Sequence, residues 1–349
     1  MSATLAQTTF FTRTFIKYGI AFIVFLFVAR VLWGVGIKVY QHYFPPPPTP
    51  PTVLFDKLPT LPLPKNQEGA KPPGFSLELP EGDLPKLPAT IPVYVIPKRS
   101  AYLGALDEAR KISSSLGFSQ NEQSVSTSTY RWKHDREDIT LEMNIITQAF
   151  SISSELYNDN ELLAQRAPNQ NTAVSHAQTF LSRATLLPKD FKDGRASTTL
   201  IKNESGNLTV AQSLSDAQFT KVDFFRQNYN DFPLVTSSPD HANVWLMVSG
   251  TTNPAKNIIA GEYHYFPIDG SQSSTYPIKT SQVAWEELQG GKGAFISPPQ
   301  DSSVTIRRVY LAYFDPADYH PFLQPVYVFE GDNNFTGFVP AVENDYYGG

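Results

Sequence analysis

Residues 100–118 read SAYLGALDEARKISSSLGF, and this stretch, with the two segments that follow it, decides the fold class. Its apolar residues recur at helical spacing on one face, and Gly117 is typical of a helix C-terminus. The next segments are STYRWKH (128–134) and DITLEMNIIT (138–147), joined by the charged turn DRED. The second segment alternates apolar and polar residues, as strands with one buried face do. A helix followed by a β-pair indicates the α+β class.

The chain continues towards its C-terminus with elements of the same kinds. Two more helices are predicted, at about 171–186 and at 280–291, and Thr280 or Ser281 can cap the second of them. The sequence therefore predicts an α+β fold with antiparallel sheets and a few packed helices. Further strands are expected in the segments AFSISSEL, STTLIKN, LTVAQSL, AQFTKVDFFRQ, NVWLMVSG, NIIAGEYHYFP, VTIRRVYLAYF, QPVYVFEG and NFTGFVPAV.

The soluble region also shows signs of a loose internal duplication. Two predicted helices, at 105–116 and 173–181, share an Ala-x-x-x-Ala frame that ends in a leucine, and strands follow each of them. We therefore expect two α+β modules, a first at 98–167 and a second at 168–349.

Residues 18–40 form an apolar run, YGIAFIVFLFVARVLWGVGIKVY, that predicts a transmembrane helix. A helix of this length reaches about 34 Å, and the hydrocarbon core of a bilayer is about 30 Å thick. Arg30 near the middle costs ~3 kcal/mol, whereas the Leu, Ile, Phe and Val residues together favour insertion by on the order of 6 kcal/mol. Arg30 either snorkels towards a headgroup layer or pairs with an acidic or polar group on a partner helix.

Flanking charge predicts the orientation of this helix. Arg13 and Lys17 precede it in a cytoplasmic tail of residues 1–17, and a long polar region follows it. We expect a signal anchor: a single-pass protein of the cell membrane with a cytoplasmic N-terminus, an extracytoplasmic C-terminal domain, and the lipid bilayer as the partner of residues 18–40. A cleaved signal peptide is the alternative, although the apolar run is longer than such peptides require.

Residues 41–97 are rich in proline and predict a linker, since they hold more than half of the chain's 29 prolines. Proline fixes φ and lacks an N–H, so we expect neither a helix nor a central strand here. Three interpretations follow. The stretch is a spacer that lifts the domain off the membrane, its later part from Phe75 to Pro97 lies along the domain surface, or it docks a partner that recognises proline.

Composition excludes several classes of function. The net charge is −5 and no basic block lies beyond the apolar run, so nucleic acid is not an expected partner. The absence of cysteine excludes disulfides, thiolate nucleophiles and cysteine-bound metals. The sequence lacks phosphate-binding, metalloprotease and nucleophile-elbow motifs. We therefore expect no catalytic residue, no cofactor and no metal ion.

Two places carry titratable residues in suggestive patterns. Glu262 and His264 would point to the same face of a strand, but a metal site needs a third ligand that the sequence does not nominate. The other interpretation is a hydrogen-bonded or exposed strand histidine. Glu286 and Glu287 are adjacent on a helix, so their side chains diverge by about 100° and cannot act as a carboxylate pair.

Aromatic residues gather near the C-terminus. Packing in the core is one interpretation of this group, and a groove for a ligand or partner is the other. The candidate residues for such an interaction surface are Tyr310, Tyr313, Tyr319 and Phe322.

The C-terminal third resembles the YycH/YycI regulatory proteins and the related PepSY-like domains. The similar segments are YPIKTSQVAWEELQGGKGAF (276–295), VTIRRVYLAYF (304–314), LQPVYVFEGD (323–332) and FVPAV (338–342). The family shows a helix with an Ala-Trp pair, a Tyr-rich strand, a Pro-x-Tyr-x-Phe strand and a closing strand, without the proline-rich linker. The matching residues are Ala284, Trp285, Leu288, Gly290, Tyr313, Pro325, Tyr327, Phe329 and Ala341.

This resemblance implies a membrane-anchored, non-enzymatic domain that regulates an envelope sensor kinase or protease through protein contacts. We therefore expect an interaction or regulatory module of the bacterial cell envelope, with a membrane or envelope protein as its partner. Two alternatives stay open. One is an envelope hydrolase that acts on peptidoglycan or peptides, and the other is a structural linker that resembles TonB in plan.

Overall fold

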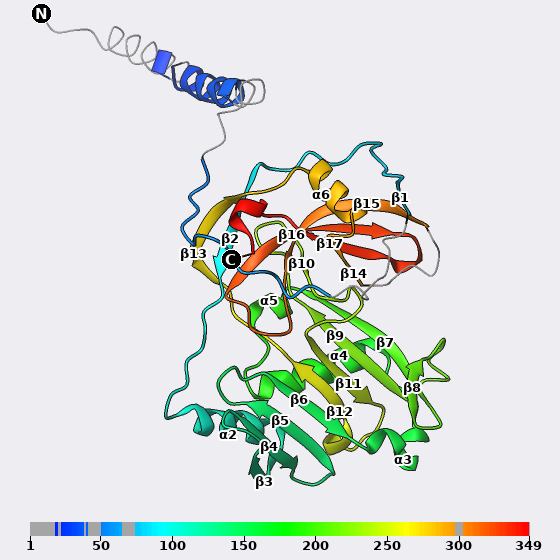
Figure 1. Ribbon diagram of the computed structural model, residues 1–349. Helices are drawn as coiled ribbons and strands as arrows, with labels where there is room; N and C mark the ends of the chain where they lie inside the picture. Colours follow the sequence, from blue (N-terminus) through cyan, green and yellow to red (C-terminus); the bar gives the residue numbers. More distant parts are fainter. Residues whose placement is uncertain are drawn as a thin grey trace, which may run out of the picture. The chain divides into compact units, whose positions relative to one another are not determined.

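The computed structural model describes residues 18–19, 22–37, 40, 50–64, 74–296 and 303–348. The chain forms two compact units, residues 1–50 and 51–349 (Figure 1). In the first unit, residues 22–37 are helical and Arg30 is exposed. Across the described part of the chain, no helix combines the length and the apolar content needed to cross a membrane. The predicted transmembrane helix at 18–40, four of whose residues lie outside the described ones, is therefore not confirmed.

The larger unit contains an antiparallel sheet for which nine strands are described, in the order β3-β4-β5-β6-β12-β11-β9-β7-β8. Its first hairpin is the predicted pair around DRED, with Trp132 opposite Leu141. The predicted hairpin around Glu-Ser-Gly-Asn is also present, as β7 and β8. The bounds are β3 (Phe118–Ser124), β4 (Thr129–His134), β5 (Ile139–Asn144), β6 (Phe150–Ser154), β7 (Arg195–Glu204), β8 (Asn207–Val210), β9 (Phe219–Phe225), β11 (Val244–Ser249) and β12 (Ile258–Tyr263).

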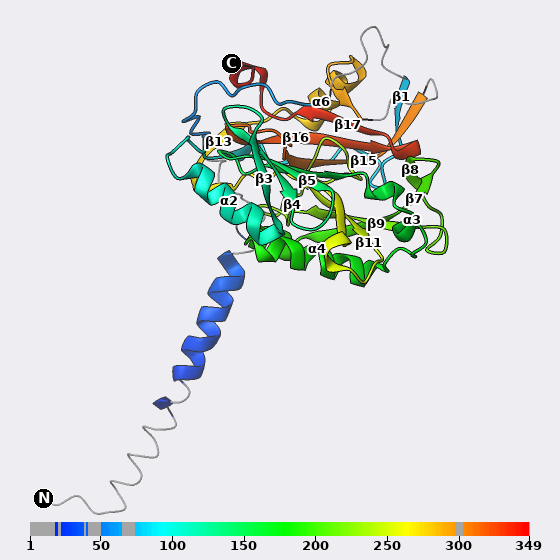
Figure 2. The same ribbon diagram turned by 90° about the horizontal axis from the view of Figure 1, so that it is seen from below.

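Two helices cover one face of this sheet, α2 (Ala105–Leu116) and α4 (Gln170–Arg183), and Figure 2 shows them next to each other. Their alanines and leucines enter one hydrophobic core with the inward residues of β4–β6, β9, β11 and β12. Gly117 ends α2 with φ 95°, and Asn169 caps α4 by accepting from the Thr172 N–H. Both helices predicted from periodicity are thus confirmed.

The opposite face of the sheet carries a small apolar cluster beneath α3 (Asn160–Leu163). This cluster contains Leu162, Phe219 and Met247. Shorter helical elements lie in the connections: η1 (Leu156–Asn158), α5 (Lys189–Lys192) and η2 (Pro254–Lys256).

A second sheet has eight described strands, with the path β1-β15-β16-β17-β14 and with β10, β2 and β13 joined at its edges. Its pairs are antiparallel, except that β1 and β10 both pair with β15 in parallel. The predicted helix α6 (Ser281–Gln289) is capped by Thr280, which accepts from the Val283 N–H, and it buries Trp285 against this sheet. The bounds are β1 (Gly74–Leu77), β2 (Thr90–Val95), β10 (Leu234–Val235), β13 (Asp269–Pro277), β14 (Ala294–Phe295), β15 (Ser303–Phe314), β16 (Phe322–Gly331) and β17 (Thr336–Pro340), with η3 (Asp332–Asn334) and η4 (Asn344–Tyr346) near the C-terminus.

The proline-rich stretch differs from the spacer that the sequence suggested. Residues 51–64 and 74–97 belong to the compact unit, and Leu58 is fully buried in it. The later part does lie on the domain, as one of the three interpretations held, but it also supplies the strands β1 and β2. Pro92 fits in β2 because only Tyr94 and Val95 pair with β16, so the missing N–H of Pro92 breaks no ladder there.

The two predicted modules meet within the nine-stranded sheet. Residue 167 lies between β6 and α4, and strands from both sides of this boundary form one continuous sheet through the antiparallel pair β6–β12. Each half of the sheet contains a helix followed by a four-stranded meander, namely α2 with β3–β6 and α4 with β7, β9, β11 and β12, and β8 adds a ninth strand beside β7. This order is the one expected for an internal duplication.

Candidate functional site

A groove of about 450 Å³ lies where the second sheet meets the connection between β9 and β11. Alternate residues of a strand face the same side of a sheet, and the register brings Tyr310, Val328 and Phe338 into one row across β15, β16 and β17. Arg308, Glu330 and Thr336 form a neighbouring row. The floor of the groove is therefore apolar along one row and charged along the next. The groove is also lined by Arg195, Phe225, Arg226 and Leu234.

Two guanidinium groups lie over aromatic rings in this groove. The Cζ of Arg195 is 4.4 Å from the centroid of the Phe225 ring, and that of Arg308 is 4.5 Å from the Tyr310 ring. Such stacking fixes the plane of a guanidinium and leaves its N–H groups free to point outward. Within the described part of the chain, no carboxylate oxygen lies at ion-pair distance from Arg195.

Glu330 is the ion-pair partner of Arg308. Its carboxylate lies 3.3 Å from the guanidinium of Arg308 and accepts a hydrogen bond of 2.6 Å from the Tyr310 hydroxyl. Burial raises the pKa of Tyr310, and the bond to Glu330 raises it further, so the hydroxyl stays protonated and donates. The groove thus offers one paired and one unpaired arginine above an apolar floor.

A buried charge network holds the groove's two walls together. The Nε of Arg226 donates to Asp190 at 2.7 Å, and its terminal nitrogen donates to Asp315 at 3.1 Å. Arg226 comes directly after β9 of the nine-stranded sheet, whereas Asp315 comes directly after β15 of the other sheet. Asn243, at the far end of the same connection, donates to the Asp315 carbonyl at 2.7 Å. The network therefore joins the two sheets.

Burial and charge oppose each other within this network. Burial raises the pKa of Asp315, and the neighbouring Arg226 only partly offsets that effect. Burial also acts against the charge on Arg226, but Asp315 and Asp190 outweigh it and raise the pKa of Arg226. One oxygen of Asp190, Oδ1, is buried and has no hydrogen-bond partner among the described residues.

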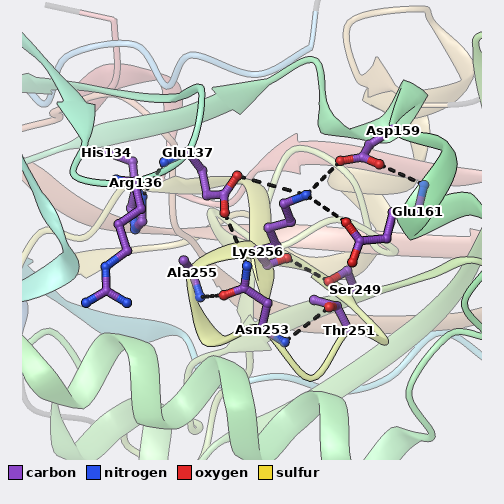
Figure 3. Close-up of polar contacts among 10 residues, drawn as sticks. All are labelled: His134, Arg136, Glu137, Asp159, Glu161, Ser249, Thr251, Asn253, Ala255 and Lys256. Atoms are coloured by element: carbon purple, nitrogen blue, oxygen red, sulfur yellow. Dashed lines mark hydrogen bonds and ion pairs between the residues drawn. The ribbon is translucent and has the colours of Figure 1, made fainter.

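A second cluster of charges lies at one end of the nine-stranded sheet, around Lys256 (Figure 3). Its ammonium group is 2.9 Å from Asp159 and 3.3 Å from Glu161, and Glu137 lies at 4.0 Å. Glu137 also accepts a hydrogen bond from Asn253. The cluster joins three connections, those between β4 and β5, between β6 and α4, and between β11 and β12.

The ammonium of Lys256 takes the central place that a cation would occupy among these carboxylates. A hydrogen bond from Lys256 lowers the pKa of Asp159, and the same bond raises the pKa of Lys256. Among the described residues, no group of three or more His, Cys, Asp and Glu side chains is arranged to hold a metal ion. We therefore treat this cluster as an ion-pair link between connections and not as a binding site.

His134 lies beside this cluster (Figure 3). It lines a smaller cavity of about 260 Å³ with Arg136, Arg183 and Ala255. The Nδ1 of His134 accepts from the backbone N–H groups of Arg136 and Glu137, each at 3.2 Å. This arrangement places the ring proton on Nε2 and requires a neutral imidazole. Burial lowers the pKa of His134, in agreement with that role.

The aromatic residues proposed as an interaction surface lie at separate places. Tyr310 lines the groove, whereas Tyr313 is fully buried on the other face of β15 and donates to the Pro92 carbonyl. Tyr319 donates to the Ile96 carbonyl and lines a different cavity. Phe322 stacks on Phe55, which comes from the proline-rich stretch. Of the four candidates, Tyr310 is the one that reaches the groove.

The two titratable pairs singled out from the sequence are Glu262 with His264 and Glu286 with Glu287. His264 lies 3.9 Å from Glu262, with no third ligand beside them in the described residues. Glu287 is ion-paired to Lys279, whereas Glu286 accepts from Gln282, so the two carboxylates point apart as expected. The arginines of the groove had no sequence signal, because Arg195, Arg226 and Arg308 come from distant segments that only the fold brings together.

No protein-family model matches the sequence, and no curated protein aligns with it significantly. The solved structures that align over most of the chain include the following two. An uncharacterized protein from Eubacterium rectale ATCC 33656 is 13% identical, with 74% of this chain and 84% of that chain covered and a TM-score of 0.38. The YpeB C-terminal domain of Bacillus megaterium is 14% identical, with 72% and 96% covered and a TM-score of 0.32. Scores this low carry no argument about function, and the resemblance to YycH/YycI proteins and PepSY-like domains stays a prediction.

Proposed function

We propose that this chain is a membrane-anchored, extracytoplasmic protein-interaction module of the bacterial cell envelope, and that the groove at Tyr310 takes up a segment of its partner. The observation that carries the proposal is the pair of guanidinium–aromatic stacks, Arg195 on Phe225 and Arg308 on Tyr310, that face a shared apolar floor. Arginine and tyrosine around an apolar pocket are the residues that most often dominate the energy of protein interfaces.

The anchor and the regulatory role rest on the sequence. The apolar run at 18–40 supplies the proposed membrane helix, and Arg30 in it is the proposed contact with a polar group of a partner helix. The likeness of the C-terminal third to YycH/YycI regulatory proteins supports a regulatory role for the interaction. Catalysis forms no part of the proposal.

The experiment is site-specific photo-crosslinking of the full chain in bacterial membranes. A photoreactive amino acid replaces Asn228, which is exposed at the groove, and in a control chain it replaces Lys111, which is exposed on α2. We expect an adduct with a membrane or envelope protein from position 228 and none from position 111. Deletion of residues 1–44 should abolish that adduct.

Two results contradict the proposal. One is the same adduct pattern from both positions, which indicates contact without a site. The other is the absence of any adduct while the soluble part alone fully complements a deletion of the gene, which removes the need for a membrane partner.

A further inference from the structure

Among the described strands, only β1 and β10 pair with the edge of β15 that faces away from β16, and they do so at its two ends. β1 pairs with it over Ser303–Ile306, and β10 pairs with it over Tyr313–Phe314. No described strand pairs with this edge between Ile306 and Tyr313. The gap spans the six residues 307–312, or roughly 20 Å of extended chain.

The backbone groups in the gap point outward. Tyr313 donates its N–H to the Pro233 carbonyl, and Asp315 donates to the Val235 carbonyl, so the odd-numbered residues of this stretch face the open edge. Val309 and Leu311 share that parity, and opposite them on β16 lie Phe329 and Tyr327, in the pairs that exchange no ladder hydrogen bonds. Their N–H and C=O groups are thus directed at the gap.

The gap lies alongside the groove. Arg308 and Tyr310 alternate with Val309 and Leu311 along β15, and they place their side chains in the groove. The groove also reaches Pro233 and Leu234, where β10 begins. An extended chain added at this edge would alternate in the same way, so every second side chain of it would enter the groove.

The charges around the groove indicate which kind of partner side chain would enter it. Arg195 has no carboxylate within ion-pair distance in the described part of the chain, and Glu330 satisfies only one part of Arg308. A single carboxylate between Arg195 and Arg308 would form an ion pair with both guanidinium groups. The apolar floor at Val328 and Phe338 would contact the aliphatic groups next to that carboxylate.

We propose that the open edge of β15 binds an extended segment of a partner protein as an added strand between β1 and β10, parallel to β15 as they are, with an acidic side chain held by Arg195 and Arg308. This inference rests on the proposed function, because it names the chemistry of the partner segment that the groove takes up. Backbone hydrogen bonds supply affinity in this mode of recognition, and the groove supplies the choice of side chain.

The test uses the full chain in detergent and three fluorescein-labelled peptides, with binding measured by anisotropy. The first is Thr-Val-Glu-Val-Thr-Val, whose length matches the gap between β1 and β10, and the second has Lys in place of Glu. The third is the first with alternate backbone nitrogens methylated on the edge that would face β15. We expect the second and third peptides to bind at least about tenfold more weakly, since a charge-assisted hydrogen bond is worth a factor of about 10 to 150.

Arg195→Glu should reverse the preference, so that the Lys peptide binds more tightly than the Glu peptide. Arg183→Glu, a matched change at an exposed arginine outside the groove, should leave the order unchanged. Equal binding of all three peptides, or no binding of the first one, overturns the inference. If position 228 still gives its adduct in membranes, the proposed function stands and only the added strand is wrong, whereas loss of that adduct contradicts the proposed function itself.

Discussion

The two halves of the nine-stranded sheet share one plan and differ most in the connection between the second and third strands of each meander. In the first half, four residues, 135–138, join β4 to β5. In the second half, the corresponding strands β9 and β11 are joined by eighteen residues, 226–243. The short connection is a charged turn. The long one contains β10, lines the groove and carries Arg226 into the joint between the sheets.

This difference shows where the fold leaves room for function. Helix α2 with its meander and helix α4 with its meander bury one continuous core, and that core constrains their strands in length and pattern. A connection at the end of a strand is free of that constraint and can lengthen at modest entropic cost. The groove, with Arg195 and Arg226, accordingly lies at the elaborated end of the second half.

The largest expected effect comes from breaking the buried charge network around Arg226, which joins the second half of the nine-stranded sheet to the other sheet. Arg226→Met leaves the carboxylates of Asp190 and Asp315 buried without their cation, and we expect a loss of about 3–5 kcal/mol in the free energy of unfolding. Urea denaturation followed by tryptophan fluorescence measures it.

Neutralising the carboxylates as well provides the control. In the triple variant Arg226→Met, Asp190→Asn, Asp315→Asn, no buried charge is left unpaired, so it should be more stable than the single variant. A single variant that loses less than about 1 kcal/mol would show that the network contributes little and that the joint rests on apolar contacts.

Most helices and strands of the nine-stranded sheet could be predicted from the sequence, whereas the charge network around Arg226 and the groove could not. The periodicity of residues 105–116 and the alternation of 139–145 report which side of an element is buried, because burial repeats with the local geometry. The strand β13 was missed, since DGSQSSTYP has neither apolar alternation nor β-branched enrichment, and it forms because β2 pairs along it.

The strand β2 was missed for the opposite reason. Its segment TIPVYV has strand composition, but the prolines around it favoured an extended linker. The groove was out of reach because Arg195 and Arg308 meet only through long-range packing. Of the aromatic residues picked from the sequence, Tyr310 and Tyr313 are three apart on one strand, so they had to face opposite sides.

The next prediction compares the C-termini of the two helices. Gly117 after α2 has φ 95°, and Thr185 after α4 has φ 59°, both in the left-handed region. A Cβ at Gly117 would also come within 3.0 Å of the His134 ring. Gly117→Ala should therefore lower the free energy of unfolding by about 1–2 kcal/mol.

Thr185→Gly should have the opposite sign. Glycine removes the strain of a β-branched residue at positive φ, although it raises the entropy of the unfolded chain, and the net gain should be about 0.5–1 kcal/mol. Both values come from urea denaturation under one set of conditions. Changes of equal sign in the two variants would mean that the two helix ends do not use the same stop geometry.

The smallest expected effect is a pH dependence that belongs to the short connection. His134 holds the turn at 135–138 through its unprotonated Nδ1, and burial lowers its pKa, although Asp135 and Glu137 act to raise it and Arg136 to lower it. Below a pH of about 6.5 the unfolded chain therefore binds more protons than the folded one. The stability that His134 contributes is complete above that pH and declines as the pH falls.

His134→Asn separates this effect from other titrations, because an asparagine oxygen can accept from the same backbone N–H groups without titrating. We expect the difference in unfolding free energy between the parent chain and this variant to shift in favour of the variant as the pH falls from 7 to 5. A difference that stays constant over this range would mean that protonated His134 is tolerated in the turn.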